Sequence, residues 1–189
     1  MKSYWKETKQ KDSLKEKVIL IGNPNVGKSV IFNYLTGKYV TVSNYPGTTV
    51  EVVAGTMIAH GKKFQVLDTP GVNSLIPMSE DEKVTRDILL KEPPTYLVQI
   101  IDAKNLRRGL LISLQLLEMG LPFLVILNMW DEAKSRGIEI KIQNLSKQLG
   151  TPILKTVATR RKGLDKIKEN LQIKPPSSIS IPYPEAIEM

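Results

Sequence analysis

Eight residues at positions 22–29 have the types and the spacing needed to hold phosphate groups. They read G-N-P-N-V-G-K-S, which fits the pattern G-x-x-x-x-G-K-S. Gly22 and Gly27 allow the backbone to curl so that successive N–H groups point inward at an anion. Lys28 can reach the β- and γ-phosphates of a nucleotide, and the Ser29 hydroxyl can ligate Mg²⁺. The segment therefore predicts a P-loop that binds a nucleoside triphosphate.

The segment D-T-P-G at positions 68–71 carries an acidic residue that could act together with the P-loop. A carboxylate at Asp68, opposite the P-loop, can hold Mg²⁺, often through a water. Gly71 would follow where a backbone N–H approaches the γ-phosphate closely, so that a side chain would be in the way. The alternative is an ordinary Asp-Thr-Pro-Gly turn without a ligand. The P-loop favours the magnesium interpretation.

The segment N-M-W-D at positions 128–131 suits a guanine base. The Asp131 carboxylate can accept from the ring N–H and the exocyclic amine together, whereas adenine lacks that donor pair. An unmatched, desolvated carboxylate costs on the order of 1–3 kcal/mol, so the pattern favours GTP over ATP. The alternative is that Asp131 N-caps the next helix. Further along, Val157-Ala158-Thr159 should close over the base, with the Ala158 N–H near the guanine oxygen.

The loop between Lys38 and Val50 is where a sensor of the γ-phosphate should lie. A threonine hydroxyl there can complete the Mg²⁺ shell when GTP is bound and let go after hydrolysis. Thr48 and Thr49 are the candidates. Residues 38–47 are otherwise polar and show no regular pattern, so we expect an irregular loop.

Short apolar runs that are typical of buried strands precede several of these motifs. We expect strands at 18–21, 50–59, 63–67, 96–101, 122–127 and 152–154. The second and third are joined by His60-Gly61, a hairpin turn that leaves His60 exposed and without a ligand role. The P-loop, Asp68, Asn128 and the segment after Leu154 all follow the carboxyl end of a strand, where α/β sheets bind ligands.

Helical patterns alternate with these strands. The first helix follows the P-loop and ends at Gly37, and the second begins with a capping box of Ser79 and Glu82 and runs to about Leu90. Three later helices are indicated by apolar residues at helical spacing: Leu106, Leu110, Leu114 and Leu117; Ile138, Ile142, Leu145 and Leu149; Leu164, Ile167 and Leu171. The alternation predicts an α/β fold of the P-loop GTPase kind, a mostly parallel sheet with one antiparallel edge strand and helices on both faces.

Composition limits the other possibilities. The 189 residues contain no cysteine and one histidine, so disulfides, cysteine sites and histidine clusters within one chain are excluded. No apolar run approaches the roughly 20 residues of a membrane span. The lack of cysteine fits a reducing compartment such as the cytoplasm. The net charge of +8 fits solvated lysines and arginines, an anionic membrane surface or RNA. We divide the chain into a tail at 1–16, in which Trp5 could dock on the body, a GTP-binding domain at 17–174 and a linker at 175–189.

These residues resemble the cytosolic G domain of FeoB-type ferrous-iron transporters, within the wider Era/TrmE-like group of GTPases. The resemblance extends from Val18 to about Leu171. It rests on five stretches: G-N-P-N-V-G-K-S at 22–29, N-Y-P-G-T-T-V-E at 44–51, D-T-P-G-V-N-S-L at 68–75, S-E-D-E-K-V-T-R-D-I-L-L at 79–90 and L-N-M-W-D-E-A-K-S-R-G-I-E-I at 127–140.

The resemblance implies a K⁺-assisted GTPase in which Lys28, Thr49, Gly71 and Asn25 are the catalytic residues. Ser29, Thr49 and Asp68 would hold Mg²⁺, and Asn25 would help seat K⁺ where other GTPases place an arginine finger. Thr49 would belong to switch I, and residues 68–87 would form switch II. Residues expected to contact the nucleotide are Asn23, Pro24, Asn25, Val26, Gly27, Lys28, Ser29, Val30, Gly47, Thr48, Thr49, Asp68, Gly71, Asn128, Met129, Asp131, Val157, Ala158 and Thr159.

Some positions depart from the family pattern. Val72 stands where Ras-like proteins keep a water-orienting glutamine, so we expect slow turnover, with water held by the switch I backbone. Thr69 replaces the usual Leu with little expected effect, and Val157 stands where many relatives have Ser, which we expect to loosen the base-binding loop. Family members continue into a helical domain and a membrane domain. We therefore expect a fragment or an isolated G module, whose partners are those two domains and which could form a homo-oligomer.

Three functions are compatible with the motifs. The first is GTP hydrolysis that regulates or drives ferrous iron uptake; iron itself should not bind, because no cluster of metal ligands is visible. The second is a ribosome-assembly GTPase, although no RNA-binding module follows and we expect no nucleic-acid partner. The third is a GTP-binding switch with negligible hydrolysis.

Overall fold

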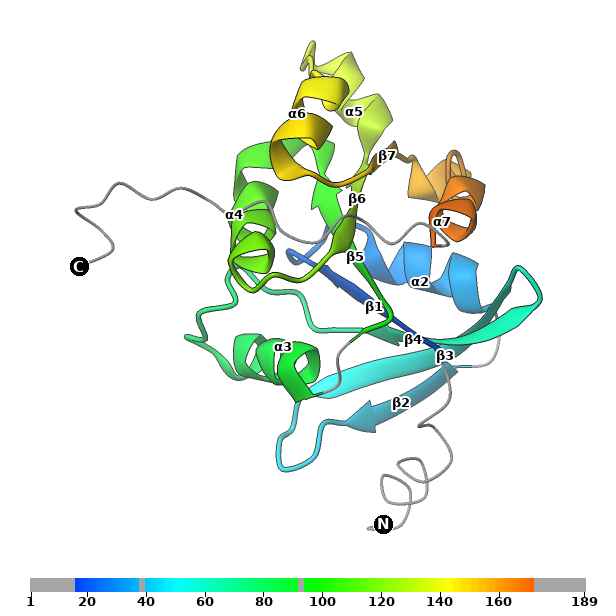
Figure 1. The fold of residues 1–189 in the computed structure, drawn as a ribbon, viewed down its shortest axis with the longest axis vertical. Coiled ribbons are helices and arrows are strands. Elements are labelled where there is room, and N and C mark those ends of the chain that lie inside the picture. The colour runs from blue at the N-terminus through cyan, green and yellow to red at the C-terminus, as the bar shows by residue number, and fades with distance from the viewer. Residues whose placement is uncertain (1–15, 38–39, 92–93, 172–189) are drawn as a thin grey trace.

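The structure, a computed structural model, describes residues 16–37, 40–91 and 94–171 (Figure 1). The expected tail, with Trp5, and the expected linker at 175–189 lie outside the described residues, apart from Glu16. Glu16 is the first residue of the first strand.

A single seven-stranded sheet forms the centre of the described part, in the order β2-β3-β4-β1-β5-β6-β7. Its strands are β1 (Glu16–Gly22), β2 (Val40–Asn44), β3 (Glu51–Ala59), β4 (Lys62–Asp68), β5 (Tyr96–Asp102), β6 (Phe123–Asn128) and β7 (Ile153–Lys155). β4, β1, β5, β6 and β7 run parallel, and β3 runs against both of its neighbours. The predicted fold class is confirmed.

The strand β2 was not predicted, because residues 38–47 were expected to be an irregular loop. Val40–Asn44 pairs antiparallel with β3, with Val42 opposite Val53. Four of its five side chains are exposed, so the strand carries no alternation of buried and exposed residues that a sequence could reveal. As a result, β2 takes the edge of the sheet, and β3 lies one place inward from the edge where we expected it.

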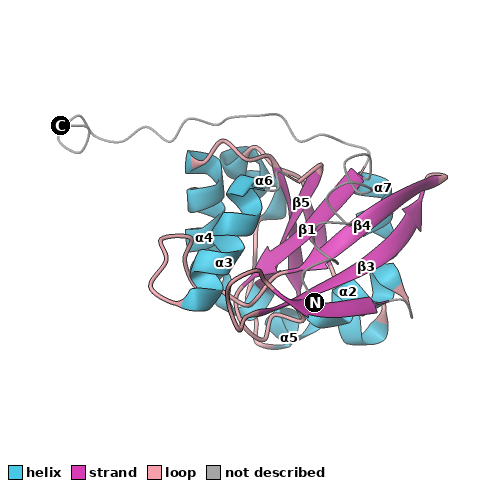
Figure 2. Ribbon diagram, turned by 90° about the horizontal axis from the view of Figure 1, so that it is seen from below, coloured by secondary structure: helices cyan, strands magenta, loops and turns pink. Residues whose placement is uncertain are grey.

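Helices cover both faces of the sheet (Figure 2). They are α2 (Lys28–Thr36), α3 (Glu80–Lys91), α4 (Leu106–Glu118), α5 (Trp130–Ser135), α6 (Ile142–Leu149) and α7 (Asp165–Asn170), with short 3₁₀ turns at Ala103–Asn105 and Ala158–Arg160. One core cluster joins the sheet to α3, α4, α5 and α6. A second joins the other face to α2 and α7.

The helix α4 buries most deeply a face that lies beside the leucine face suggested by its sequence. Its buried residues are Gly109, Ile112, Ser113, Gln115 and Leu116, whereas Leu114 is 42% exposed. A side chain at Gly109 would lie 2.4 Å from the Ile101 side chain, so only glycine allows this close approach to β5. Ser113 Oγ donates to Gln99 Oε1 at 2.8 Å, and Gln99 Nε2 donates to Gly109 O at 2.8 Å. The buried face of the helix therefore combines Ile112 and Leu116 with a polar patch that is hydrogen-bonded to Gln99 of β5. Three leucines of the predicted face are half-buried and pack against the same core: Leu106, Leu110 and Leu117.

Most other local predictions are confirmed. The Gly37 N–H caps α2 by donating to Asn33 O. The Glu82 N–H donates to Ser79 Oγ at 3.3 Å at the start of α3. His60 is exposed on the β3–β4 turn, where its Nε2 lies 2.8 Å from Lys168 O. The helix expected from Ile138 begins four residues later, as α6.

Candidate nucleotide-binding site

The P-loop connects the end of β1 to the start of α2, as its pattern predicts. Asn25 and Gly27 adopt the left-handed conformation, with φ of 64° and 86°. Gly22 does not; a Cβ there would lie 2.3 Å from Ile100 O, so this glycine serves the close approach of β5 rather than the curl of the loop. The N-cap of α2 is Gly27, which has no side chain to cap the first turn, and such a helix start suits an anion.

Asp68 lies at the end of β4, beside β1, and faces the first turn of α2. Its Oδ1 is 3.0 Å from Lys28 Nζ, and its Oδ2 accepts from Ser29 Oγ at 3.0 Å. The Lys28 and Asp68 side chains are only 10% and 7% exposed, so the pair is largely desolvated. A hydroxyl and a carboxylate in contact are the oxygen donors that Mg²⁺ prefers, and these residues therefore fit the predicted ion.

The start of the predicted switch II is tied to the P-loop. The Val72 N–H donates to Gly22 O at 3.1 Å, and Asn23 Nδ2 donates to Val72 O at 3.0 Å. A Cβ at Gly71 would lie 2.8 Å from Pro24 Cα. Glycine is therefore required at position 71 by contact with the P-loop backbone, in addition to any role towards a phosphate.

Asn128 connects the P-loop to the segment after β7. Its Nδ2 donates to Val26 O at 2.9 Å, while its Oδ1 accepts from Thr156 Oγ1 and from the Ala158 N–H, both at 3.0 Å. In this structure the Ala158 N–H is thus engaged by Asn128. Thr156 was not among the predicted site residues, and nothing in the local sequence distinguishes it from a loop threonine.

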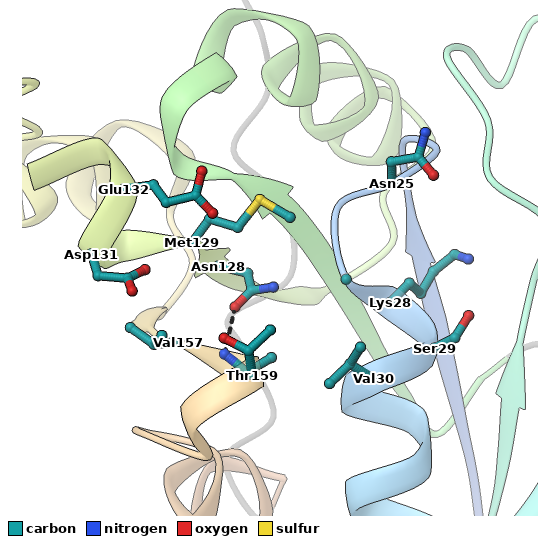
Figure 3. Close-up of a pocket in the computed structure, with 12 residues that line it drawn as sticks. Asn25, Lys28, Ser29, Val30, Asn128, Met129, Asp131, Glu132, Val157 and Thr159 are labelled. Carbon is teal, nitrogen blue, oxygen red and sulfur yellow. Dashed lines mark hydrogen bonds between the residues drawn. The ribbon is translucent and has the colours of Figure 1, made fainter. Parts of the chain in front are cut away.

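The predicted residues from three loops surround one pocket of about 350 Å³ (Figure 3). The P-loop and α2 contribute Asn25, Gly27, Lys28, Ser29 and Val30; the segment after β6 contributes Asn128, Met129 and Asp131; the segment after β7 contributes Val157, Ala158 and Thr159. Glu132, which was not predicted, completes the lining. Lys28 and Ser29 lie on one side of the pocket, with Met129 and Asp131 on the other and Asn128 between them (Figure 3).

Asp131 lies in the first turn of α5 rather than at its N-cap, so the alternative role as an N-cap is wrong. The N-cap is Met129, which adopts φ of 57°. Arg160 Nη1 is 3.6 Å from Asp131 Oδ2, in a pair whose side chains are 66% and 32% exposed. The carboxylate expected to bind guanine therefore has a solvated cation beside it in this structure.

Other predicted residues do not line the pocket. Gly47, Thr48 and Thr49 lie in the β2–β3 loop, in which Thr48 Oγ1 donates to Tyr45 O at 3.0 Å and accepts from the Val50 N–H at 3.2 Å. Tyr45 packs against the core cluster that contains α3. Asn23 and Val26 are buried at 3% exposure, and the Asn23 side chain donates to Val72 O. Pro24, Asp68 and Gly71 are also outside the lining, so the pocket brings together the P-loop and the segments after β6 and β7 but not the predicted switch residues.

Three side chains that sequence reasoning missed hold the following part of switch II. Glu82 Oε2 accepts from the Met78 N–H at 2.9 Å, Gln115 Oε1 accepts from the Leu75 N–H at 2.8 Å, and Arg108 Nη2 donates to Asn73 Oδ1 at 2.7 Å. The Met78 N–H and its neighbours lower the pKa of Glu82 below its ordinary value, against burial, which raises it. Glu82 was predicted only as part of a capping box.

The sheet order, the P-loop and the pocket together define a P-loop GTPase domain. The family model described as "Ferrous iron transport protein B" matches residues 16–171, and the chain belongs to that family. The resemblance proposed from the sequence is confirmed.

Individual relatives agree. The Fe(2+) transporter FeoB of Escherichia coli K12 is 40% identical over 153 residues, which are 79% of this chain and 20% of the relative. That of Staphylococcus aureus strain COL is 42% identical over 148 residues, 78% of this chain and 22% of the relative. The chain thus spans about a fifth of the length of these curated relatives.

Solved structures show the same fold. The FeoB G domain from Methanococcus jannaschii has a TM-score of 0.75 at 42% identity, covering 85% of this chain and 97% of that one. The cytosolic domain of T. maritima FeoB in GDP form II has a TM-score of 0.86 at 36% identity, covering 92% and 70%. Within the described residues of the present chain, no helix has the length and apolar character needed to cross a membrane.

Proposed function

We propose that this chain is the GTP-binding domain of a FeoB-type ferrous iron transporter and hydrolyses GTP slowly with the help of Mg²⁺ and K⁺. The observation that carries the proposal is the single pocket in which the P-loop meets Asn128 and Asp131. Solved relatives add support, since the T. maritima cytosolic domain is described in a GDP form and in a GMPPNP form.

At the phosphate end, Lys28 is the principal binding group. It pairs with Asp68 in this structure, and incoming β- and γ-phosphates would draw its ammonium towards themselves. Ser29 and Asp68 would then supply oxygen ligands to Mg²⁺, which when bound neutralises charge on the phosphates. Thr49 would join them only after the β2–β3 loop moves, as expected of a sensor of the γ-phosphate.

At the base end, the Asp131 carboxylate would accept from the two donors of guanine and exclude adenine. Asn128 would act by holding the P-loop against the segment 156–158, through the three hydrogen bonds described above. Arg160 is exposed and can turn away into solvent, so its weak pairing with Asp131 is no obstacle to the base.

The chemistry would rest on positioning rather than on a polarising side chain. Val72 is buried and apolar, and it cannot orient a water. The Gly71 N–H would approach the γ-phosphate from the segment held against Pro24. The side-chain carbonyl oxygen of Asn25, which lines the pocket, is the kind of ligand that suits K⁺. Slow turnover follows from the lack of a glutamine, and an added cation would be worth roughly 10³–10⁵ in rate where it replaces an arginine finger.

The decisive experiment measures affinity for GTP, GDP and ATP in magnesium buffer, followed by GTPase rates in K⁺ and in Na⁺. We expect guanine nucleotides to bind far more tightly than ATP, Asp131→Ala to remove that preference, and hydrolysis to be faster in K⁺. Equal affinity for ATP would refute the guanine assignment. If no GTP were hydrolysed in a single-turnover assay in K⁺, the domain would instead be a GTP-binding switch without catalysis.

The remaining parts of the proposal concern the longer protein. We infer that this domain acts at the cytoplasmic face of the membrane, with the helical and membrane domains of a full-length transporter as its partners. Whether it also self-associates can be read from its mass in solution with and without nucleotide. RNA retention that weakens with salt would favour a ribosome-assembly GTPase instead.

A further inference from the structure

Lys104 is a side chain outside the P-loop whose position is set by the register of two central strands. Asp102 at the end of β5 lies opposite Asn128 at the end of β6. The Asp102 carboxylate accepts from the Lys104 N–H at 2.9 Å and caps the 3₁₀ turn that follows β5. The Lys104 side chain is therefore directed at the residues after Asn128, and it is only 17% exposed.

The Lys104 ammonium joins two side chains of the pocket wall. Its Nζ lies 3.4 Å from Met129 Sδ and 2.5 Å from Glu132 Oε2. Met129 and Glu132 both line the pocket, on the same side as Asp131 (Figure 3). Lys104 itself is not part of the lining, so any effect on a ligand must pass through these two residues.

Met129 needs such a restraint. It has three rotatable side-chain bonds, adopts a left-handed backbone conformation with φ of 57°, and forms the N-cap of α5 without a side-chain hydrogen bond to the helix. Ordering a flexible methionine against a flat base costs conformational entropy. A contact that already orders it in the free protein lowers that cost at the moment of binding.

The charges around the pocket give a second reason to expect that Lys104 affects nucleotide binding. A nucleotide is an anion, and the base side of its pocket carries the carboxylates of Asp131 and Glu132. Asp131 has a task in recognising guanine, whereas Glu132 has none at the base and repels the ligand. Lys104 pairs with Glu132 and, more distantly, with Asp102 Oδ2 at 3.8 Å, so it offsets part of the Glu132 charge.

We propose that Lys104 is a positioning residue for the guanine base, which fixes Met129 against the base and neutralises Glu132 at the pocket wall. The inference rests on the proposed guanine-nucleotide site. We expect Lys104 to affect nucleotide affinity, equally for GDP and GTP, and not the hydrolysis step. The reason is that Lys28 and Ser29 lie at the other end of the pocket.

The test compares Lys104→Met with the wild type, using a fluorescent GDP for dissociation rates and unlabelled GDP and GTP in competition. We expect Lys104→Met to bind both nucleotides about threefold to tenfold more weakly, a range typical of one partly exposed ion pair together with one restrained side chain. The KM for GTP should rise by the same factor with kcat unchanged, and Lys104→Arg should restore affinity. In the Glu132→Gln background, the effect of Lys104→Met should shrink.

The matched control is Lys134→Met, which removes one positive charge from α5 outside the pocket lining. An equal loss in this control would overturn the proposal, because it would reduce the effect to net charge. Unchanged affinity in Lys104→Met, or a loss confined to GTP, would overturn it as well. Failure of the wild type to bind guanine nucleotides would refute the proposed function itself, and the thermal midpoint of each variant separates lost affinity from lost folding.

Discussion

Replacing Asn128 by alanine should destabilise the protein even when no nucleotide is present. The side chain is 3% exposed, donates one hydrogen bond to Val26 O and accepts two, from Thr156 Oγ1 and the Ala158 N–H. Each net hydrogen bond is worth about 1 kcal/mol, and a buried group left without its partner costs up to about 3 kcal/mol. We therefore expect Asn128→Ala to lower the free energy of unfolding by about 3 kcal/mol or somewhat more.

The assays are urea unfolding and thermal unfolding of the nucleotide-free protein, both followed by far-UV circular dichroism. In a domain of this size a loss of about 3 kcal/mol should lower the melting temperature by about 6–12 °C. Asp131→Ala is the matched control in the same pocket, because its side chain is part-exposed and its ion pair with Arg160 is solvated. Asp131→Ala should lose guanine affinity while keeping its stability.

Asn128→Ala thus tests a residue that stabilises the site, and Asp131→Ala tests a residue that is expected to recognise the guanine base. If Asn128→Ala unfolded at nearly the wild-type urea concentration, with a loss below about 1 kcal/mol, Asn128 would not be the structural link between the loops. A stability loss in Asp131→Ala as large as that in Asn128→Ala would contradict the same reasoning from the other side.

Three further predictions concern the loops around the pocket. The pKa of Glu82 is lower in the folded state than in the unfolded state, so the Glu82 carboxylate stabilises the fold fully above its unfolded pKa. This stabilisation is lost as the pH falls through the folded pKa. Between pH 6 and pH 3 the wild type should therefore lose more stability than Glu82→Gln, as measured by urea midpoints. Gln115→Ala should cost about 1–3 kcal/mol and speed hydrogen exchange at Leu75, because that buried N–H loses its acceptor. Arg160→Ala should tighten GDP binding by no more than about fivefold in calorimetry, by freeing Asp131 from a solvated cation; weaker binding would show that Arg160 contacts the nucleotide instead.

The parts of the fold that could be predicted are those in which one segment carries its own signal. The apolar run before the P-loop became β1, and the N-x-x-D segment follows β6 as expected. β2 could not be found, because its pairing with β3 supplies its order while its own side chains face solvent. The buried face of α4 was predicted only in part. Leu106, Leu110 and Leu117 pack against the core. The most buried face lies beside them, because Gly109 and Ser113 pack against β5.

The candidate site divides in the same way. Sequence motifs identified residues that belong to one short segment, such as Lys28 and Ser29 at the start of α2. They could not identify Lys104 and Glu132, which meet across 28 positions of sequence, or Gln115 and Leu75, which meet across 40. Long-range pairs of this kind carry no local pattern and appear only once the strand register is fixed.

The two ends of the pocket constrain each other. A Cβ at Gly27 would lie 2.4 Å from Asn128 Nδ2, so the glycine of the phosphate loop is required by the base-side asparagine as well as by its own φ of 86°. Asn128 in turn donates to the P-loop at Val26 O. The P-loop and the segment that begins at Asn128 are therefore held together as one unit before any ligand binds. We expect the cost of ordering this unit on nucleotide binding to be small. Thr49 lies outside this unit, in the β2–β3 loop. The free-energy cost of moving that loop can be offset only by a ligand that makes contacts with Thr49. On this reasoning we expect the preformed pocket to set the affinity for GDP, and the β2–β3 loop to contribute to the difference between GTP and GDP beside Lys28 and the Gly71 N–H.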